Sequence, residues 1–185
     1  LMLAPGIRTI ADVAMDVVNY FKPPKSREYR CWVPKADQPI YAVRDQILRR
    51  YRTLLTALGN RCAGEDNKPE LYIVAHSQGT VISADMLVSH QARELLRPFS
   101  EVHLVTVGSP LTHVYQYYFP IQYAEFDKRW GSLFYEKELL QSWTNYFRID
   151  DYVGTHILAP ESGDAKKPVY PCNIALERGG HLGYF

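Results

Sequence analysis

The feature that most constrains the fold is a short apolar run that passes almost directly into a helix. Residues 71–75 (Leu-Tyr-Ile-Val-Ala) have the length and character of a strand, and apolar side chains return at helical spacing a few residues later. These inward-facing positions are Val81, Ile82, Met86 and Leu87. A strand that is apolar on both sides of the pleat is typical of a parallel sheet with both faces covered. The segment therefore predicts a buried strand followed by a crossover helix.

The same alternation continues along the chain. Further strands are predicted at residues 102–107 and 143–149, and a weaker one at 172–176. Helices are predicted at residues 7–22 and over a segment with five apolar residues on one face: Val43, Ile47, Tyr51, Leu54 and Leu58. The arginines of that second helix are expected to form a solvated face: Arg44, Arg49, Arg50 and Arg52. A short strand near residues 29–33 is also expected. Together these elements predict an α/β fold, a mostly parallel sheet with helices on both faces.

Composition excludes several classes of protein. The 185 residues carry 21 lysines and arginines against 20 aspartates and glutamates, so no nucleic-acid partner is expected. Cys31, Cys62 and Cys172 are widely spaced, which argues against a disulfide framework and a structural zinc site and favours a reducing compartment. The sequence has neither an apolar stretch of membrane-spanning length nor a signal-peptide pattern. We therefore expect a cytoplasmic protein.

The turn between the first strand and its helix carries the strongest chemical signal. Ala75-His76-Ser77-Gln78-Gly79 occupies the strand-to-helix position of a nucleophile elbow, in which the serine hydroxyl stands clear of the backbone. The positions two before and two after the serine must be small, and Ala75 and Gly79 are small. The N–H of Gln78, at the helix N-terminus, would face developing oxyanion charge. The alternative is a serine that merely caps the helix.

A nucleophilic serine needs a histidine base oriented by a carboxylate. In this kind of sheet the acid follows a later strand and the histidine lies near the C-terminus. Asp150 and Asp151 follow the strand at 143–149, and His181 lies at the far end. His156 is a weaker candidate base, and His76, inside the turn, is expected to point away from Ser77 and to serve in packing or hydrogen bonding.

Four segments resemble lipase-like α/β-hydrolases, including bacterial hydrolases related to class 3 lipases. They are residues 74–83, 107–111, 143–154 and 181–185, within a stretch of roughly 71–185. In that family the acid occurs as Asp-x-Val, which matches Asp151 better than Asp150, and the histidine precedes a small residue and an aromatic pair, which matches His181. The resemblance implies an α/β-hydrolase-type domain over residues 1–185, possessing a Ser77, Asp151 and His181 triad that cleaves carboxylic esters. It implies a small-molecule ester or lipid substrate and requires no metal or organic cofactor.

Aromatic residues crowd the segment between the second and third strands. They are Tyr115, Tyr117, Tyr118, Phe119, Tyr123, Phe126, Trp130, Phe134 and Tyr135. One interpretation is an acyl pocket or lid that suits an apolar acid. The other is ordinary packing of a helical excursion onto the sheet, because aromatics are common core residues.

One part expected from the resemblance is missing. Relatives supply a second oxyanion donor from a loop after an earlier strand, and the segment Leu3-Ala4-Pro5-Gly6 is only a weak substitute. We therefore expect that this domain lacks upstream strands of a parent protein, which could also attach it to a membrane. The same triad would serve an acyltransferase or a thioesterase. A non-catalytic module for partner or lipid binding is the remaining alternative.

Overall fold

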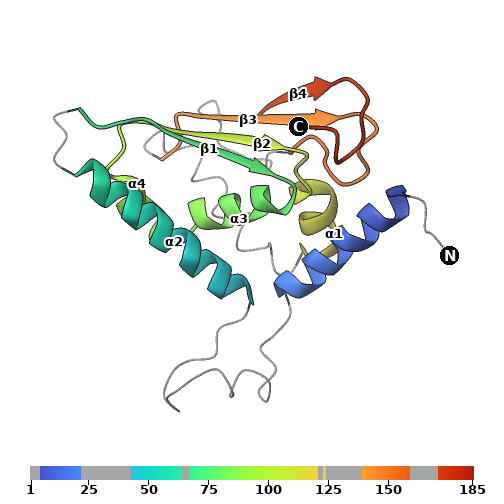
Figure 1. Ribbon diagram of the computed structural model, residues 1–185, viewed down its shortest axis with the longest axis horizontal. Coiled ribbons are helices and arrows are strands. Elements are labelled where there is room, and N and C mark those ends of the chain that lie inside the picture. The colour runs from blue at the N-terminus through green and yellow to red at the C-terminus, as the bar shows by residue number, and fades with distance from the viewer. Residues whose placement is uncertain (1–4, 22–42, 64–66, 121–122, 124–138, 159–170) are drawn as a thin grey trace, which may run out of the picture.

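The computed structural model describes residues 5–21, 43–63, 67–120, 123, 139–158 and 171–185 (Figure 1). The helices and strands are α1 (Pro5–Phe21), α2 (Val43–Cys62), β1 (Leu71–His76), α3 (Gln78–Leu87), α4 (Ala92–Leu96), β2 (Val102–Val107), the π-helical segment η1 (Leu111–Gln116), β3 (Ser142–Arg148) and β4 (Cys172–Leu176). The four predicted strands and the two predicted N-terminal helices are therefore present. The strand expected near residues 29–33 lies outside the described residues.

The four strands form one parallel sheet in the order β1-β2-β3-β4. Ile73 pairs with Leu104, and Leu104 pairs with Trp143, so that apolar side chains align across the first three strands. Because the strands are parallel, the residues that follow β1, β2 and β3 meet at one edge of the sheet. This edge receives Ser77, Gly108 and Asp151. The α/β fold is confirmed.

The helices lie on one face of the sheet, which differs from the expectation of helices on both faces. Figure 1 shows α1, α2, α3, α4 and η1 all on the same side of the strands. The strand order runs in one direction across the described sheet, and the crossover from β1 to β2, which contains α3 and α4, lies on this face. The part of the chain that the structure describes therefore leaves the other face without helices.

The exposure of β1 follows from this arrangement. Ile73 and Ala75 are buried toward the helices, whereas Tyr72 is 60% and Val74 is 64% exposed on the opposite face. The prediction that this strand is buried on both faces is therefore wrong for the described structure. Its apolar composition alone could not reveal whether a second layer covers it.

The core lies between the sheet and the helices. Its largest fully buried side chains are Trp143, Tyr20, Tyr115, Tyr123, Met86 and Leu87. No helix among the described residues is both long enough and apolar enough to cross a membrane.

A buried polar cluster connects α1 and α2 to α3 by hydrogen bonds. The Tyr20 hydroxyl donates to Asp85 Oδ2 at 2.6 Å, and Arg44 Nε donates to the same oxygen at 2.9 Å. Burial raises the pKa of Asp85, and the hydrogen bonds from Arg44 and Tyr20 only partly offset this effect. Arg44 is thus half-buried in an ion pair, so the expectation of a wholly solvated arginine face is wrong at this position.

Candidate functional site

Ser77 occupies a strained turn between β1 and α3. Its φ of 50° and ψ of −128° make it the only non-glycine residue with positive φ in the described structure. Such a conformation costs on the order of 1–3 kcal/mol, so the surroundings must hold it in place. The Ser77 N–H donates to the Val107 carbonyl at 3.0 Å, and Thr80 donates to the Ser77 carbonyl from its N–H and its hydroxyl. The neighbouring strand β2 and the helix α3 therefore both hold the turn.

The Ser77 hydroxyl does not cap the helix. Although Ser77 precedes α3, its side chain makes no capping hydrogen bond. Gln78 is the first residue of α3, where a backbone N–H has no acceptor within the helix. Its side chain instead donates to the Asp16 carbonyl of α1 at 3.2 Å and to the Tyr115 hydroxyl at 3.1 Å. The Ser77 hydroxyl therefore makes no hydrogen bond to the start of α3.

The two small residues around Ser77 face each other. A methyl group added at Gly79 would lie 3.9 Å from the Ala75 side chain, an ordinary van der Waals distance. One extra carbon would therefore fit at Gly79. The steric requirement expected from the sequence applies to larger side chains only.

The structure brings Ser77, His181 and Asp151 together. His181 Nε2 lies 2.8 Å from Ser77 Oγ, and His181 Nδ1 lies 2.9 Å from Asp151 Oδ2 and 3.1 Å from Oδ1. When Nδ1 carries the proton and donates to the carboxylate, the Nε2 lone pair can accept the serine proton. The acid and base side chains are almost fully buried. Ser77 and His181 are 104 positions apart in the chain, and Asp151 and His181 are 30 apart.

Asp151 is held as a carboxylate by a set of donors. Burial alone raises its pKa, but hydrogen bonds from the His181 ring, the backbone of Gly154 and Val153 and the Tyr184 hydroxyl outweigh burial. The Val153 N–H lies 2.8 Å from Oδ1, and the Tyr184 hydroxyl lies 2.8 Å from Oδ2. The pKa of Asp151 therefore falls below its usual value, and the group is charged at neutral pH.

Arg148, the last residue of β3, and Asp150, which follows β3, hold the loop that carries His181. Asp150 accepts hydrogen bonds from the N–H groups of Gly179 and Gly180. The Arg148 guanidinium donates to the carbonyls of residues 177, 178 and 183, and it lies 5.2 Å from the centre of the Tyr184 ring. Asp150, the alternative acid, therefore contacts loop amides, and no described contact joins it to the His181 ring.

Two backbone segments lie close together beside Asp151. A methyl group added at Gly154 would lie 2.3 Å from the Gly108 carbonyl carbon and 2.6 Å from Asp151 Oδ2. Gly108 itself has a φ of 58°, a conformation that glycine adopts without strain. Glycine at both positions lets the loops after β2 and β3 touch beside the carboxylate.

His76 supports His181 and does not reach Ser77 through a described contact. The two imidazole rings stack with 5.2 Å between their centres, and His76 Nε2 lies 3.3 Å from the His181 carbonyl. Burial lowers the pKa of His76, so its ring is mainly neutral. The expectation of a packing and hydrogen-bonding role agrees with this position. His156 is exposed and lies beside Phe147.

The described aromatics of the segment after β2 divide into a packed group and an exposed pair. Tyr115, Phe119 and Tyr123 surround Phe21 of α1, with ring centres 4.5–6.0 Å from it. Tyr117 and Tyr118 are exposed. The three inner rings serve as core packing, and the remaining members, Phe126, Trp130, Phe134 and Tyr135, lie outside the described residues. Of the segment considered as a second oxyanion donor, Leu3 and Ala4 also lie outside the described residues.

Two residues of the site have no counterpart in the sequence predictions. Tyr184 was expected only as an aromatic near His181, yet its hydroxyl bonds the acid and accepts the Arg148 N–H at 2.8 Å. Arg148 gave no signal, because an arginine at the end of a strand is usually solvated. One sequence pattern could have indicated Tyr184: it follows His181 by three residues in a glycine-rich turn.

The assembled groups can carry out nucleophilic acyl transfer. A serine oxygen lies beside a histidine base, a buried carboxylate orients that base, and a helix N-terminus begins at the next residue. A comparison of the chain with models of protein families, with curated proteins and with solved structures finds no match.

Proposed function

We propose that the protein is a serine hydrolase that cleaves carboxylic esters through Ser77, His181 and Asp151. The observation that carries the proposal is the 2.8 Å contact of Ser77 Oγ with His181 Nε2 at a strained turn. A non-glycine residue held at positive φ is costly, and such strain is concentrated at functional sites. A serine that served only packing would need neither this conformation nor a carboxylate-bound histidine.

The proposed reaction begins with attack of Ser77 Oγ on the ester carbonyl carbon. His181 Nε2 takes the serine proton, and the new C–O bond gives a tetrahedral oxyanion near the Gln78 N–H. Collapse expels the alcohol, which takes the proton from His181 and leaves an acyl-serine. Water, deprotonated by His181, then attacks the acyl carbon. The bond from that carbon to Ser77 Oγ breaks, His181 returns the proton to Oγ, and the acid is released. Asp151 keeps the proton of His181 on Nδ1 and stabilises the imidazolium that forms in each half.

The loop contacts support this proposal because the base sits on a loop and not on a helix or strand. Asp150 and Arg148 bind the backbone on both sides of His181. A misplacement of about 1 Å at a catalytic group can cost on the order of 100-fold in rate. The hydrogen bonds that hold the His181 loop are therefore consistent with a base whose exact position determines the reaction rate.

An acyltransferase or thioesterase would use the same residues. The sequence resemblance to lipase-like α/β-hydrolases favours an ester or lipid substrate, and the specific hydrolase fold is part of this proposal. A non-catalytic binding module is the second candidate. The buried carboxylate argues against it, because a binding surface gains nothing from an oriented histidine tautomer.

Labelling with a fluorophosphonate probe tests the proposal. The wild-type protein should be labelled covalently and Ser77→Ala should not, because the probe reacts with a serine whose proton a base removes. Ser100→Ala is the matched control, since Ser100 is exposed and far along the chain from the site, and it should be labelled like wild type. Equal labelling of wild type and Ser77→Ala would overturn the proposal.

Turnover of p-nitrophenyl esters of increasing chain length separates the alternatives. Hydrolysis that Ser77→Ala abolishes supports the esterase. Covalent labelling with no hydrolysis of any oxygen ester, but with turnover of acyl thioesters, would assign the same triad to a thioesterase. Absence of both labelling and turnover in folded protein would favour the binding module.

A further inference from the structure

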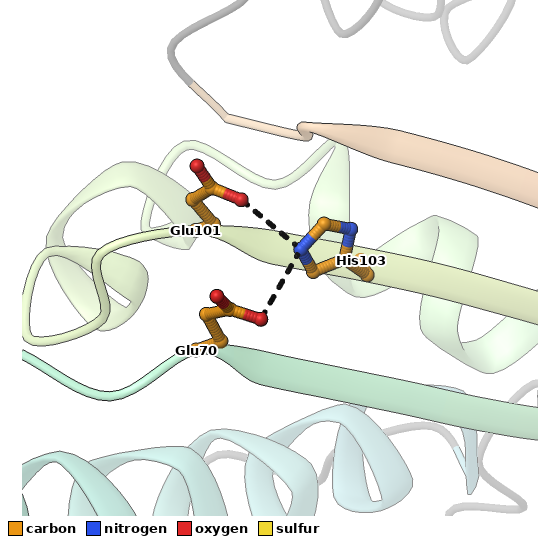
Figure 2. Close-up of side chains that lie close together, drawn as sticks. All are labelled: Glu70, Glu101 and His103. Carbon is orange, nitrogen blue, oxygen red and sulfur yellow. Dashed lines mark ion pairs between the residues drawn. The ribbon is translucent and has the colours of Figure 1, made fainter.

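The amino-terminal ends of β1 and β2 hold a second cluster of ionisable side chains. Glu70 precedes β1, Glu101 precedes β2, and His103 is the second residue of β2 (Figure 2). One ligand atom from each of the three residues lies within 4.8 Å of the other two. His103 Nε2 is 3.4 Å from Glu101 Oε2 and 3.9 Å from Glu70 Oε2. The cluster lies at the opposite end of β1 from Ser77.

The histidine of this cluster is oriented by groups outside it. His103 Nδ1 lies 2.8 Å from the Ser142 hydroxyl on β3, and the ring stacks on Tyr72 with 4.5 Å between centres and 12° between planes. The Tyr72 hydroxyl donates to Glu70 Oε2 at 2.7 Å. Tyr72 therefore positions both the imidazole and one carboxylate. Outer partners of this kind, which fix the ring and one acid, are a regular feature of metal ligands.

The environment of His103 Nε2 indicates a ligand site. The side chain is only 14% exposed, and Nε2 itself is buried without a hydrogen-bond partner in the described structure. Figure 2 shows this nitrogen facing the space between the two carboxylates. No hydrogen bond of the described structure joins Nε2 to either carboxylate, although both carboxylates face it. A cation between the three atoms would satisfy all of them.

The spacing of the three atoms suits a small divalent ion. Ligands bound at about 2.0–2.1 Å around a tetrahedral ion lie about 3.3 Å apart. The 3.4 Å separation already matches, and the 3.9 Å separation needs a small rotation of a half-exposed glutamate. Imidazole nitrogen with carboxylate oxygens suits a transition metal such as zinc better than magnesium or calcium, which prefer oxygen ligands alone.

We propose that Glu70, Glu101 and His103 bind a divalent transition-metal ion of the zinc type, with water completing the coordination. The ion would join the start of β1 to the start of β2. Parallel strands run about 3.3 Å per residue, so this end of β1 lies roughly 20 Å from Ser77. The bound metal is therefore a structural clamp and takes no part in the acyl chemistry.

Zinc titration of the metal-stripped full chain tests this inference. Protein freed of metal by chelation is titrated with zinc alone, in competition with a chromophoric chelator. Wild type should show one competing site per chain, and Tyr72→Phe should bind zinc about tenfold more weakly because Glu70 loses its partner. Glu70→Gln and Glu101→Gln should each weaken binding at least tenfold, and His103→Gln should abolish this site.

The controls keep the inference falsifiable. His90→Gln removes an exposed histidine elsewhere and should bind zinc like wild type. If His103→Gln fails to fold, the two glutamate variants decide, because their side chains are half-exposed and their removal should leave the fold intact. Zinc affinity that survives in both glutamate variants, or a wild-type chain with no competing site, would overturn the proposal.

Discussion

The two ends of the sheet present the same three kinds of group in reversed order. At the carboxyl end, His181 binds a carboxylate through Nδ1 and a serine through Nε2. At the amino end, His103 contacts a serine through Nδ1 and faces two carboxylates through Nε2. The two clusters therefore differ in which ring nitrogen faces which partner, and the two proposals assign them different chemistry.

Burial and backbone strain separate the two clusters further. The carboxylate of Asp151 is fully buried and held by several donors, whereas Glu70 and Glu101 have half-exposed side chains. Ser77 is held at positive φ, whereas Ser142 is the first residue of a regular strand. A fixed, dry carboxylate suits proton transfer through a histidine. Half-exposed carboxylates with room to rotate suit the binding of an ion. The difference teaches that a serine beside a histidine is not by itself a nucleophile.

The largest expected effect is at the histidine of the carboxyl end. His181→Gln should lower ester turnover by on the order of 10,000-fold or more, because Ser77 loses its base. The same variant should bind zinc with wild-type affinity, since His181 lies at the other end of the sheet. His90→Gln, the matched surface change, should keep full turnover. Steady-state kinetics and the zinc titration measure the two outcomes, and loss of zinc binding in His181→Gln would show that the two ends are not independent.

Two adjacent aspartates offer the next test. Asp151→Asn should reduce kcat by on the order of 10,000-fold, because an amide cannot hold the productive tautomer of His181. Asp150→Asn should reduce it by no more than about 100-fold, because Asp150 only positions the loop through the amides of Gly179 and Gly180. Measurement of kcat for both variants at saturating ester decides which aspartate is the acid of the triad. A larger loss in Asp150→Asn would reverse the assignment of the acid.

The sequence predicted the strands and the carboxyl-end residues because both depend on local pattern and chain order. Apolar runs located all four strands to within a residue or two, and the turn motif together with the order of acid and histidine selected the residues that the structure brings together. In both cases the decisive information lies within a few neighbouring residues. The topology of parallel strands then carries distant segments to one edge.

What the sequence did not predict depends on packing between segments. The absence of described helices from one face of the sheet depends on which segments pack together, and the burial of Arg44 depends on Asp85, which lies on another helix. The cluster at the amino end could have been suspected, since Glu101 and His103 are two residues apart and so share a face of β2. Glu70 joins them only because β1 and β2 pair with Leu71 beside Val102, and no local pattern reports that register.

The smallest expected effect is the pH dependence of stability. The folded-state pKa of Asp151 is below its unfolded value, so Asp151 stabilises the fold above the unfolded value of about 3.9, and this contribution is lost as pH falls through the folded pKa. Wild type should therefore be more stable to unfolding than Asp151→Asn at pH 6, and the difference in unfolding free energy should narrow below about pH 4. Urea unfolding of both proteins across pH 3–7 measures the gap. A gap that widens on acidification would mean that burial, and not the hydrogen bonds from His181 and Tyr184, controls this carboxyl group, and the contrast between the two ends of the sheet would lose its electrostatic basis.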